Sequence, residues 1–231
     1  MTFTQKTIFF VTVLTAFAVL MALGTWQVKR LAWKQDLLAT IAKQQAQTPL
    51  VISHYKALKD FQPVTLKGEF LYAYEKFLTP RTRDGVKGVH HIVPLMFENG
   101  KDMMFVNRGF IPDDQMDDLR PMQGQVEITG YVRELPHQGV FTPDNNAGEK
   151  NIYWVDRKGF VDEYDMPLKS MAPYVFYQTS VHSGPPYPLP HTANIDIPNN
   201  HFKYAVFWFF MGFVMLVIAT LFYIRQKKHD R

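Results

Sequence analysis

The chain has 231 residues and a formal net charge of only +4 at pH 7. It has no cysteine, which excludes disulfides and thiol-based redox, iron–sulfur or copper sites. A mean hydropathy of -0.15 hides the concentration of apolar residues at the two ends. The small positive charge lies largely beside those ends, so it does not indicate a nucleic-acid-binding surface. Between the ends, roughly 165–175 residues are enough for one domain with its own core.

The first apolar segment, residues 7–28, contains no charged side chain. About 20 helical residues, rising 1.5 Å each, cross the ~30 Å hydrocarbon core of a bilayer, so the segment predicts a transmembrane helix. A cleaved signal peptide is the alternative, because Ala22-Leu23-Gly24 offers small residues for cleavage and Lys6 a charged start. The short leading segment lacks an Arg- and Ser-rich transit peptide, which favours a bacterial inner membrane over a mitochondrial one.

Residues 29–200 predict an extracytoplasmic domain, mainly antiparallel and β-rich, with a barrel-like or sandwich-like form and short helices. Its first part, residues 29–47, should continue the helix, because apolar residues recur at helical spacing from Trp33 to Ile41 before Pro49. Short alternating segments with polar turns then indicate strands. The segments predicted as strands are 64–66, 91–97, 102–107, 125–133, 153–155 and 173–178.

Smaller features of this domain are also predicted. Glu98-Asn99-Gly100-Lys101 indicates a hairpin turn between two of the strands, since Asn and Gly tolerate positive φ. Gly130 interrupts a strand, which suggests a bulge or close packing. Residues 160–164 could form a helical turn and 142–150 an exposed loop. The proline-rich segment 184–190 should be an extended spacer leading back to the membrane.

The second apolar segment predicts a transmembrane helix over residues 201–224, followed by a basic tail at residues 225–231. The tail carries Arg225, Lys227, Lys228 and Arg231, whereas only Lys203 precedes the uncharged stretch. Basic residues stay on the cytoplasmic side, so the C-terminus should be cytoplasmic, and two spans put the N-terminus there too. The domain would then lie in the periplasm, which is expected despite basic residues after the first span, because long domains are translocated regardless of charge.

One histidine stands at the outer mouth of the second span. On a helix, a single face would carry His201, Ala205, Trp208, Gly212, Met215 and Ala219. Such a face could let a flat macrocycle or another helix approach closely, and the first span offers Ala18 and Ala22 as matching small positions. An imidazole at the rim of an apolar groove can ligate haem iron, with Arg30 of the first span near a propionate. From the residues alone, an interfacial histidine bonded to lipid headgroups or to Asn200 is the favoured alternative.

Motifs of enzymes are missing from the sequence. It contains no nucleophile elbow, phosphate-binding loop or zinc-binding helix. The remaining histidines lack ligand spacing, and His90 and His91 are adjacent, so on a strand they point to opposite faces. We therefore expect a protein that is not an enzyme, with a membrane-anchored periplasmic hydrolase as the less favoured alternative.

Four sequence motifs resemble the Surfeit locus protein 1 family of cytochrome c oxidase assembly factors. After the first span, Gly24-Thr-Trp26-Gln27-Val-Lys-Arg30-Leu-Ala-Trp33-Lys34 is similar to the family's Gly-x-Trp-Gln-x-x-Arg-x-x-Trp-Lys. Within the domain, residues 106–112 match Val-Asn-Arg-Gly-Trp-hydrophobic-Pro, with Phe110 where tryptophan is commoner, and Asn151, Trp154 and Asp156 fit a weaker pattern. At the second span, residues 198–208 match Pro-Asn-Asn-His-x-x-Tyr-Ala-x-x-Trp.

This resemblance covers essentially the whole chain and implies a retained first helix. It also implies work on oxidase subunit I and, for bacterial members, transient binding of haem a through the histidine that corresponds to His201. Haem a synthase is a further possible partner. Tyr204 and Trp208 would line the macrocycle, and Trp26 could close the groove from the first span. A cofactor-free membrane scaffold that grips an oxidase subunit is the main alternative.

Overall fold

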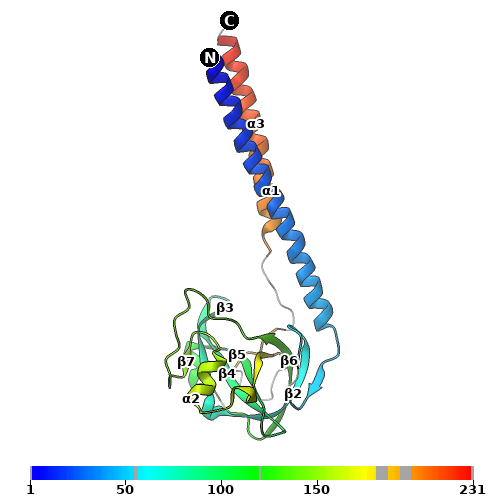
Figure 1. Cartoon of the computed structure of the whole chain (residues 1–231), viewed down its shortest axis with the longest axis vertical. Coiled ribbons are helices and arrows are strands. Elements are labelled where there is room, and N and C mark those ends of the chain that lie inside the picture. The colour runs from blue at the N-terminus through cyan, green and yellow to red at the C-terminus, as the bar shows by residue number, and fades with distance from the viewer. Residues whose placement is uncertain (1, 55–56, 120, 181–186, 193–198, 230–231) are drawn as a thin grey trace. The chain divides into compact units, whose positions relative to one another are not determined.

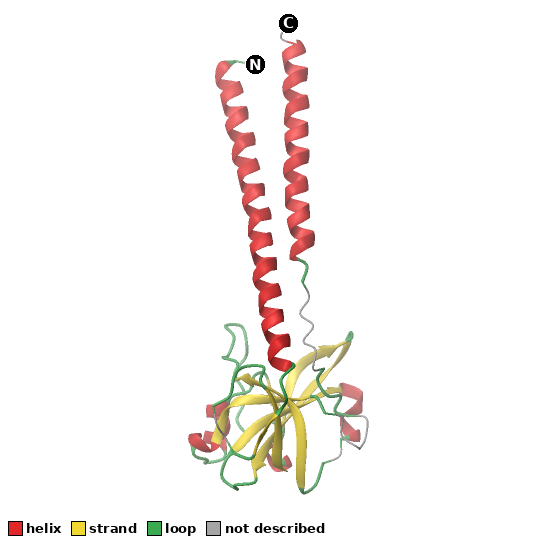
Figure 2. Ribbon diagram, turned by 90° about the vertical axis from the view of Figure 1, so that its right-hand side faces the viewer, coloured by secondary structure: helices red, strands yellow, loops and turns green. Residues whose placement is uncertain are grey.

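The computed structural model describes residues 2–54, 57–119, 121–180, 187–192 and 199–229. The chain forms two compact units: Met1–Thr40 together with Asp196–Arg231, and Ile41–Ile195. The first unit is a pair of helices and the second is a β-rich domain (Figures 1 and 2). The predicted fold is confirmed: one apolar helix precedes a strand-rich domain in the sequence and another follows it.

The helix pair consists of α1 (Phe3–Gln45) and α3 (His201–His229), each long and apolar enough to cross a membrane. Both views show them side by side, with the start of α1 and the end of α3 at the same end of the pair (Figures 1 and 2). Only 6% and 11% of their most apolar windows are buried, whereas the core helix of a soluble protein would be mostly buried. These outward-facing apolar side chains therefore favour membrane anchoring.

The second unit is built around a closed barrel of five strands. β2 (Pro63–Phe70), β6 (Gln125–Glu134), β8 (Met171–Gln178), β5 (Met103–Pro112) and β4 (Val86–Phe97) pair in that order, and β2 pairs again with β4. The β5–β8 pair is parallel and the other four pairs in the ring are antiparallel. Closure lets every strand of the ring pair on both sides.

Three shorter or peripheral strands extend this barrel. β1 (Leu50–Ile52) adds parallel to β2, β3 (Lys76–Arg83) adds antiparallel to β4, and β7 (Asn151–Ile152) adds parallel to β3. Strand β4 has 12 residues and changes neighbour along its length: its first part pairs with β3 and its last residues pair with β2. Strands β3 and β7 therefore extend the sheet beyond the closed ring, next to the first part of β4 (strands labelled in Figure 1).

The domain has two main apolar clusters. The larger includes Leu66, Leu95, Val106 and Phe176, which come from four strands of the ring. The second packs α2 (Arg157–Glu163) against β5 and β8, with Phe160 beside Phe105. Helix α2 begins at Asp156, whose side chain accepts a hydrogen bond from the Gly159 backbone N–H at 3.0 Å. Such an N-cap satisfies one of the unpaired donors of a helix start.

The remaining elements are the 3-10 helices η1 (Tyr72–Tyr74), η2 (Asp113–Asp118), which is kinked at Gln115, and η3 (Leu168–Ser170). The prediction of a strand at 153–155 was wrong: the strand is β7, two residues earlier, because Asn145 holds the backbone of Tyr153 and Trp154 in a loop instead. Gly130 forms no bulge; a β-carbon there would lie 2.0 Å from the Tyr177 carbonyl oxygen, so the glycine permits a close approach of β8.

The proline-rich segment is only partly a spacer. Residues 184–186 lie outside the described part of the chain, but Leu189 exchanges two backbone hydrogen bonds with Phe110, at 2.8 and 2.9 Å. Leu189 therefore pairs with the last part of β5, beyond the residues of β5 that pair with β8.

Candidate functional site

The candidate site is the end of the helix pair at which α3 begins. Residues of α3 that are shielded from solvent recur at alternating spacings of four and three, as in helices packed along a common seam. They include His201, Ala205, Trp208, Gly212, Met215 and Ala219; Val214, Tyr223 and Gln226 are also partly shielded. This is the face that the sequence predicted.

The small residues that allow close packing on α1 differ from those predicted. Ala18 and Ala22 are exposed, so they are not the matching positions. A β-carbon on Gly24 would instead lie 2.6 Å from the Phe209 ring, and one on Gly212 would lie 2.5 Å from the methyl carbon of Met21. The seam of α1 therefore runs through Met21 and Gly24, on a different face of the helix from Ala18 and Ala22.

A hydrogen bond joins the two helices at this end. His201 Nδ1 lies 2.8 Å from Gln27 Oε1, and the Gln27 side chain is buried, with 9% of its surface exposed. The half-buried imidazole keeps its second nitrogen, Nε2, without a hydrogen bond to any residue in the described part of the chain. Sequence reasoning missed Gln27 as a partner, although its position three residues after Gly24 places it on the same helical face.

An open groove lies at the start of α3, and His201 itself is not among its described lining residues. It has a volume of about 470 Å³, and its described lining residues are Asn200, Lys203, Tyr204, Phe207 and Trp208. Both aromatic residues predicted on this helix, Tyr204 and Trp208, line it. The predicted α1 residues do not: Trp26 is 56% exposed, and the exposed Arg30 guanidinium stacks on the Trp33 ring at 4.0 Å.

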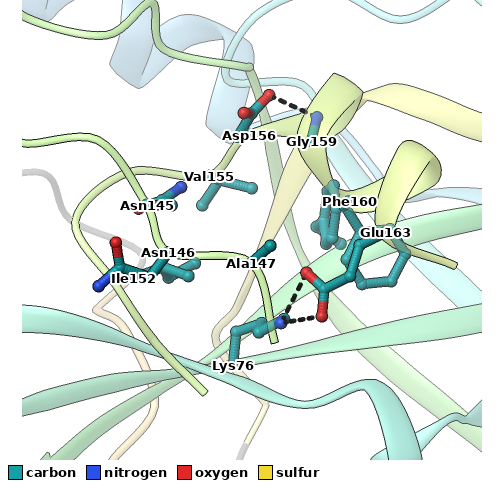
Figure 3. Close-up of a pocket in the computed structure, with 11 residues that line it drawn as sticks. Lys76, Asn145, Asn146, Ala147, Ile152, Val155, Asp156, Gly159, Phe160 and Glu163 are labelled. Carbon is teal, nitrogen blue, oxygen red and sulfur yellow. Dashed lines mark hydrogen bonds and ion pairs between the residues drawn. The ribbon is translucent and has the colours of Figure 1, made fainter. Parts of the chain in front are cut away.

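A narrow cavity in the domain tests the hydrolase alternative (Figure 3). It has a volume of about 100 Å³ and is lined by residues of α2, β3 and the 145–147 loop. Both of its carboxylates have structural partners: Asp156 caps α2, and Glu163 pairs with Lys76 at 2.8 Å. The residues that line it include no serine and no histidine. Both carboxylates of this cavity are therefore engaged in structural contacts.

Two histidine rings of the domain, those of His90 and His191, lie close together. The rings of His90 and His191 lie 5.0 Å apart, although the sequence predicted no pairing for His191. Burial and nearby arginines lower the pKa of His90 to about 4, and burial together with His90 lowers the pKa of His191 to about 3. The described residues contain no group of three or more potential metal ligands of the His, Cys, Asp or Glu type. Among the residues that the structure describes, this pair therefore has no third metal ligand.

These features define a class of membrane-anchored proteins: the chain has an apolar helix before and after a closed β-barrel domain, and a histidine lies where the two helices pair. The SURF1 family model matches residues 14–213, so the chain belongs to the SURF1 family.

Similar proteins with SURF1 or Surfeit locus protein 1 names support this family assignment. The SURF1-like protein of Monosiga brevicollis is 29% identical over 228 residues, covering 90% of this chain and 84% of that protein. Surfeit locus protein 1 of Gallus gallus is 29% identical, covering 85% of this chain and 68% of that protein. Surfeit locus protein 1 of Homo sapiens is 26% identical, covering 81% and 68%. The family match therefore runs from within α1, through the domain, into the first part of α3.

Proposed function

We propose that this protein is an assembly factor for cytochrome c oxidase, which binds haem a transiently through His201 and aids its insertion into subunit I. The observation that carries the proposal is how the two ring nitrogens of His201 are engaged. One ring nitrogen is engaged by Gln27 and the other has no partner among the described residues. Membership of the SURF1 family and the Asn-Asn-His motif support the same direction.

The residues around His201 suit a haem. A neutral imidazole nitrogen is a common axial ligand of haem iron. The neighbouring groove offers the rings of Tyr204 and Trp208 to the macrocycle and the Lys203 ammonium to a propionate. The volume of the groove is within the usual range for small-molecule sites, roughly 300–1,000 Å³. We also propose Trp26 and Arg30 as contacts contributed by α1.

In this role haem a is cargo, and its iron chemistry belongs to the oxidase that receives it. His201 holds the iron, while the aromatic side chains beside it keep the apolar ring away from water. The affinity should be moderate, since each ~1.4 kcal/mol of extra binding makes release about tenfold less favourable. An open groove with a single protein ligand is consistent with release to a partner.

The proposed setting follows from the charges and the helices. We propose a bacterial inner membrane with both termini in the cytoplasm and the barrel domain in the periplasm, because the basic residues gather after α3. Oxidase subunit I is the proposed partner within the membrane, and haem a synthase is the proposed donor of the haem.

The test is purification of the full chain from cells that make haem a. The wild type should retain haem a, and His201→Ala should reduce the retained haem at least about tenfold, because the axial bond is lost. His54→Ala is the matched control, since His54 is exposed in the domain, and it should retain haem like the wild type.

The same experiment separates the alternatives. If the wild type copurifies with oxidase subunit I and never with haem, the protein is a cofactor-free scaffold. If His201→Ala retains as much haem a as the wild type, the assignment of the ligand is wrong.

A further inference from the structure

A buried amide on an apolar helix needs an explanation. Gln27 lies near the end of the uncharged segment of α1, and its side chain is among the few polar ones that the structure buries. Burying an amide without a hydrogen bond costs roughly 1–3 kcal/mol, so a polar side chain on a helix–helix seam is retained where it has a partner. Its partner here is the His201 ring, at 2.8 Å.

The chemistry of this bond determines where the imidazole proton lies. The amide oxygen Oε1 of Gln27 can only accept a hydrogen bond, so the Nδ1 atom of His201 must carry the hydrogen. A neutral imidazole has one N–H, and the other nitrogen, Nε2, is then left with its lone pair exposed. A metal needs that lone pair, and ligand histidines commonly donate their other N–H to a fixed acceptor.

The geometry of the helix seam makes Gln27 a fixed acceptor. Three residues before it, Gly24 lets the Phe209 ring approach α1 so closely that a β-carbon would lie 2.6 Å from the ring. On the facing helix, Ala205 is buried one turn after His201, with 4% of its surface exposed. The amide and the imidazole are therefore held between closely packed turns of both helices.

We propose that Gln27 is a positioning residue for the haem ligand: it fixes His201 as the Nδ1–H tautomer and so presents Nε2 to iron. This proposal rests on the proposed function for its second half, while its first half concerns the haem-free protein. It assigns a physical role to the glutamine that follows Trp26, a role that neither the sequence nor the family resemblance supplied.

The first measurement uses the haem-free full chain, with ¹⁵N-labelled histidine, in detergent micelles at neutral pH. The nitrogen chemical shifts of His201, assigned by their loss in His201→Ala, distinguish the two tautomers. The wild type should show Nδ1–H, and Gln27→Leu should lose this preference. Gln27→Glu keeps an acceptor oxygen and should restore it. Gln35→Leu, an exposed glutamine on the same helix, is the matched control and should leave the signals unchanged.

The second measurement uses the haem-loaded protein. A stronger acceptor makes the imidazole a stronger electron donor to iron. The midpoint potential should therefore fall in Gln27→Glu and rise in Gln27→Leu, and Gln27→Leu should lose about 10- to 100-fold in haem affinity. A glutamine that only joined the helices would leave the potential unchanged wherever haem remained bound.

The outcomes are distinct. An Nε2–H tautomer in the wild type, or equal tautomers in wild type and Gln27→Leu, overturns the proposal even if haem binds through His201. If the tautomer responds to Gln27 but the wild type never binds haem, the proposed function is wrong and the role toward iron is wrong with it. The proposal stands only when tautomer and potential both respond.

Discussion

Arg108 is among the largest side chains that the domain buries completely, with 1% of its surface exposed. It is the extra residue of a β-bulge, because His91 pairs with Gly109 while Ile92 pairs with Asn107. The bulge directs the guanidinium toward Phe70 and Tyr72, and Nη1 donates to the Tyr72 hydroxyl at 2.8 Å. Burial lowers the pKa of Arg108.

The two neighbours of Arg108 complete the bulge. The Asn107 side chain accepts a hydrogen bond from the Gly109 backbone N–H at 3.2 Å. Gly109 has a φ of +132°, and a β-carbon there would lie 2.0 Å from the Leu189 carbonyl oxygen. The Asn-Arg-Gly motif therefore has a structural explanation in the barrel. The sequence identified the motif but not this role, because a bulge depends on the register of two strands.

Glu75 is a carboxylate that interacts electrostatically with Arg108. His91 Nε2 lies 2.9 Å from Glu75 Oε2, and Lys150 Nζ lies 2.8 Å from Glu75 Oε1. The hydrogen bond from His91, then that from Lys150, lowers the pKa of Glu75 to about 2. Burial lowers the pKa of His91, which therefore donates as a neutral ring.

We predict that Glu75→Gln lowers the free energy of unfolding of the domain, by an amount that depends on pH. A lowered carboxyl pKa stabilises the fold above the unfolded value, about 4.3, and this contribution is lost as the pH falls toward 2. The variant should be less stable than the wild type by about 1–3 kcal/mol at pH 7, and the difference should shrink between pH 4.5 and 2. Hydrogen exchange of β4 amides measures this free energy of opening.

The control for this prediction is Glu127→Gln. Glu127 pairs with Lys67 at 3.2 Å but is 59% exposed, so its loss should cost less than about 1 kcal/mol. A Glu75→Gln effect that is as small, or that persists at pH 2, would contradict the electrostatic explanation.

At the scale of elements, the helix pair was predictable from the pattern of α3 but not from that of α1. His201, Ala205 and Trp208 follow a spacing of four and then three residues, which is visible in the sequence. The first span contains small residues on several faces, so the pattern alone did not single out Gly24. The choice depends on where the Phe209 ring of the other helix lies.

We predict that Gly24→Leu weakens the pairing of α1 and α3, whereas Ala22→Leu does not. The leucine at position 24 would overlap the Phe209 ring, and overpacking typically costs about 1–3 kcal/mol. Ala22 is exposed, so a larger side chain there meets no helix. The rings of Phe10 on α1 and Tyr223 on α3 lie 5.3 Å apart. When both residues are replaced by cysteine, the yield of cross-linking by a short bismaleimide reagent measures the pairing of the two helices.

The cross-linked fraction should fall in Gly24→Leu and stay at the wild-type level in Ala22→Leu. Because the natural chain has no cysteine, no other thiol competes for the reagent. Equal yields in the two variants would show that Gly24 does not lie on the seam.

For the strands too, the local sequence pattern predicted some features, whereas others depend on contacts between distant residues. Segments that alternate apolar and polar residues, such as β6, were predicted nearly to their ends. β3 was missed, because its second half reads Thr-Pro-Arg-Thr-Arg and its burial depends on β4 beside it. The parallel pairs and the β2–β4 contact that closes the ring join distant residues, which no local pattern predicts.

At the scale of the whole molecule, the barrel carries its own core. Its larger apolar cluster extends from Ile52 to Phe176, so all its members belong to the unit Ile41–Ile195. The seam of the helix pair likewise joins residues of the other unit only.

We predict that residues 41–195 fold when expressed alone. A closed ring and a complete core are the conditions for independent folding of a domain of this size. Amides of β5 and β8 should be protected from hydrogen exchange as strongly in the isolated domain as in the full chain. Loss of that protection in the isolated domain would mean that the helices contribute to its stability.

The way β4 changes neighbours has a practical consequence. The ring closes where the last residues of β4 pair with β2, and neither β3 nor β7 takes part in that closure. The loop that joins β6 to β7 can therefore be lengthened without opening the ring. In the loop after β6, the turn at Gly139–Thr142 exposes Val140 at 94% and Phe141 at 99%. A fluorescent reporter or an affinity tag spliced into that turn would leave both ends of the chain unmodified, so the protein could be followed in living cells with its helices intact.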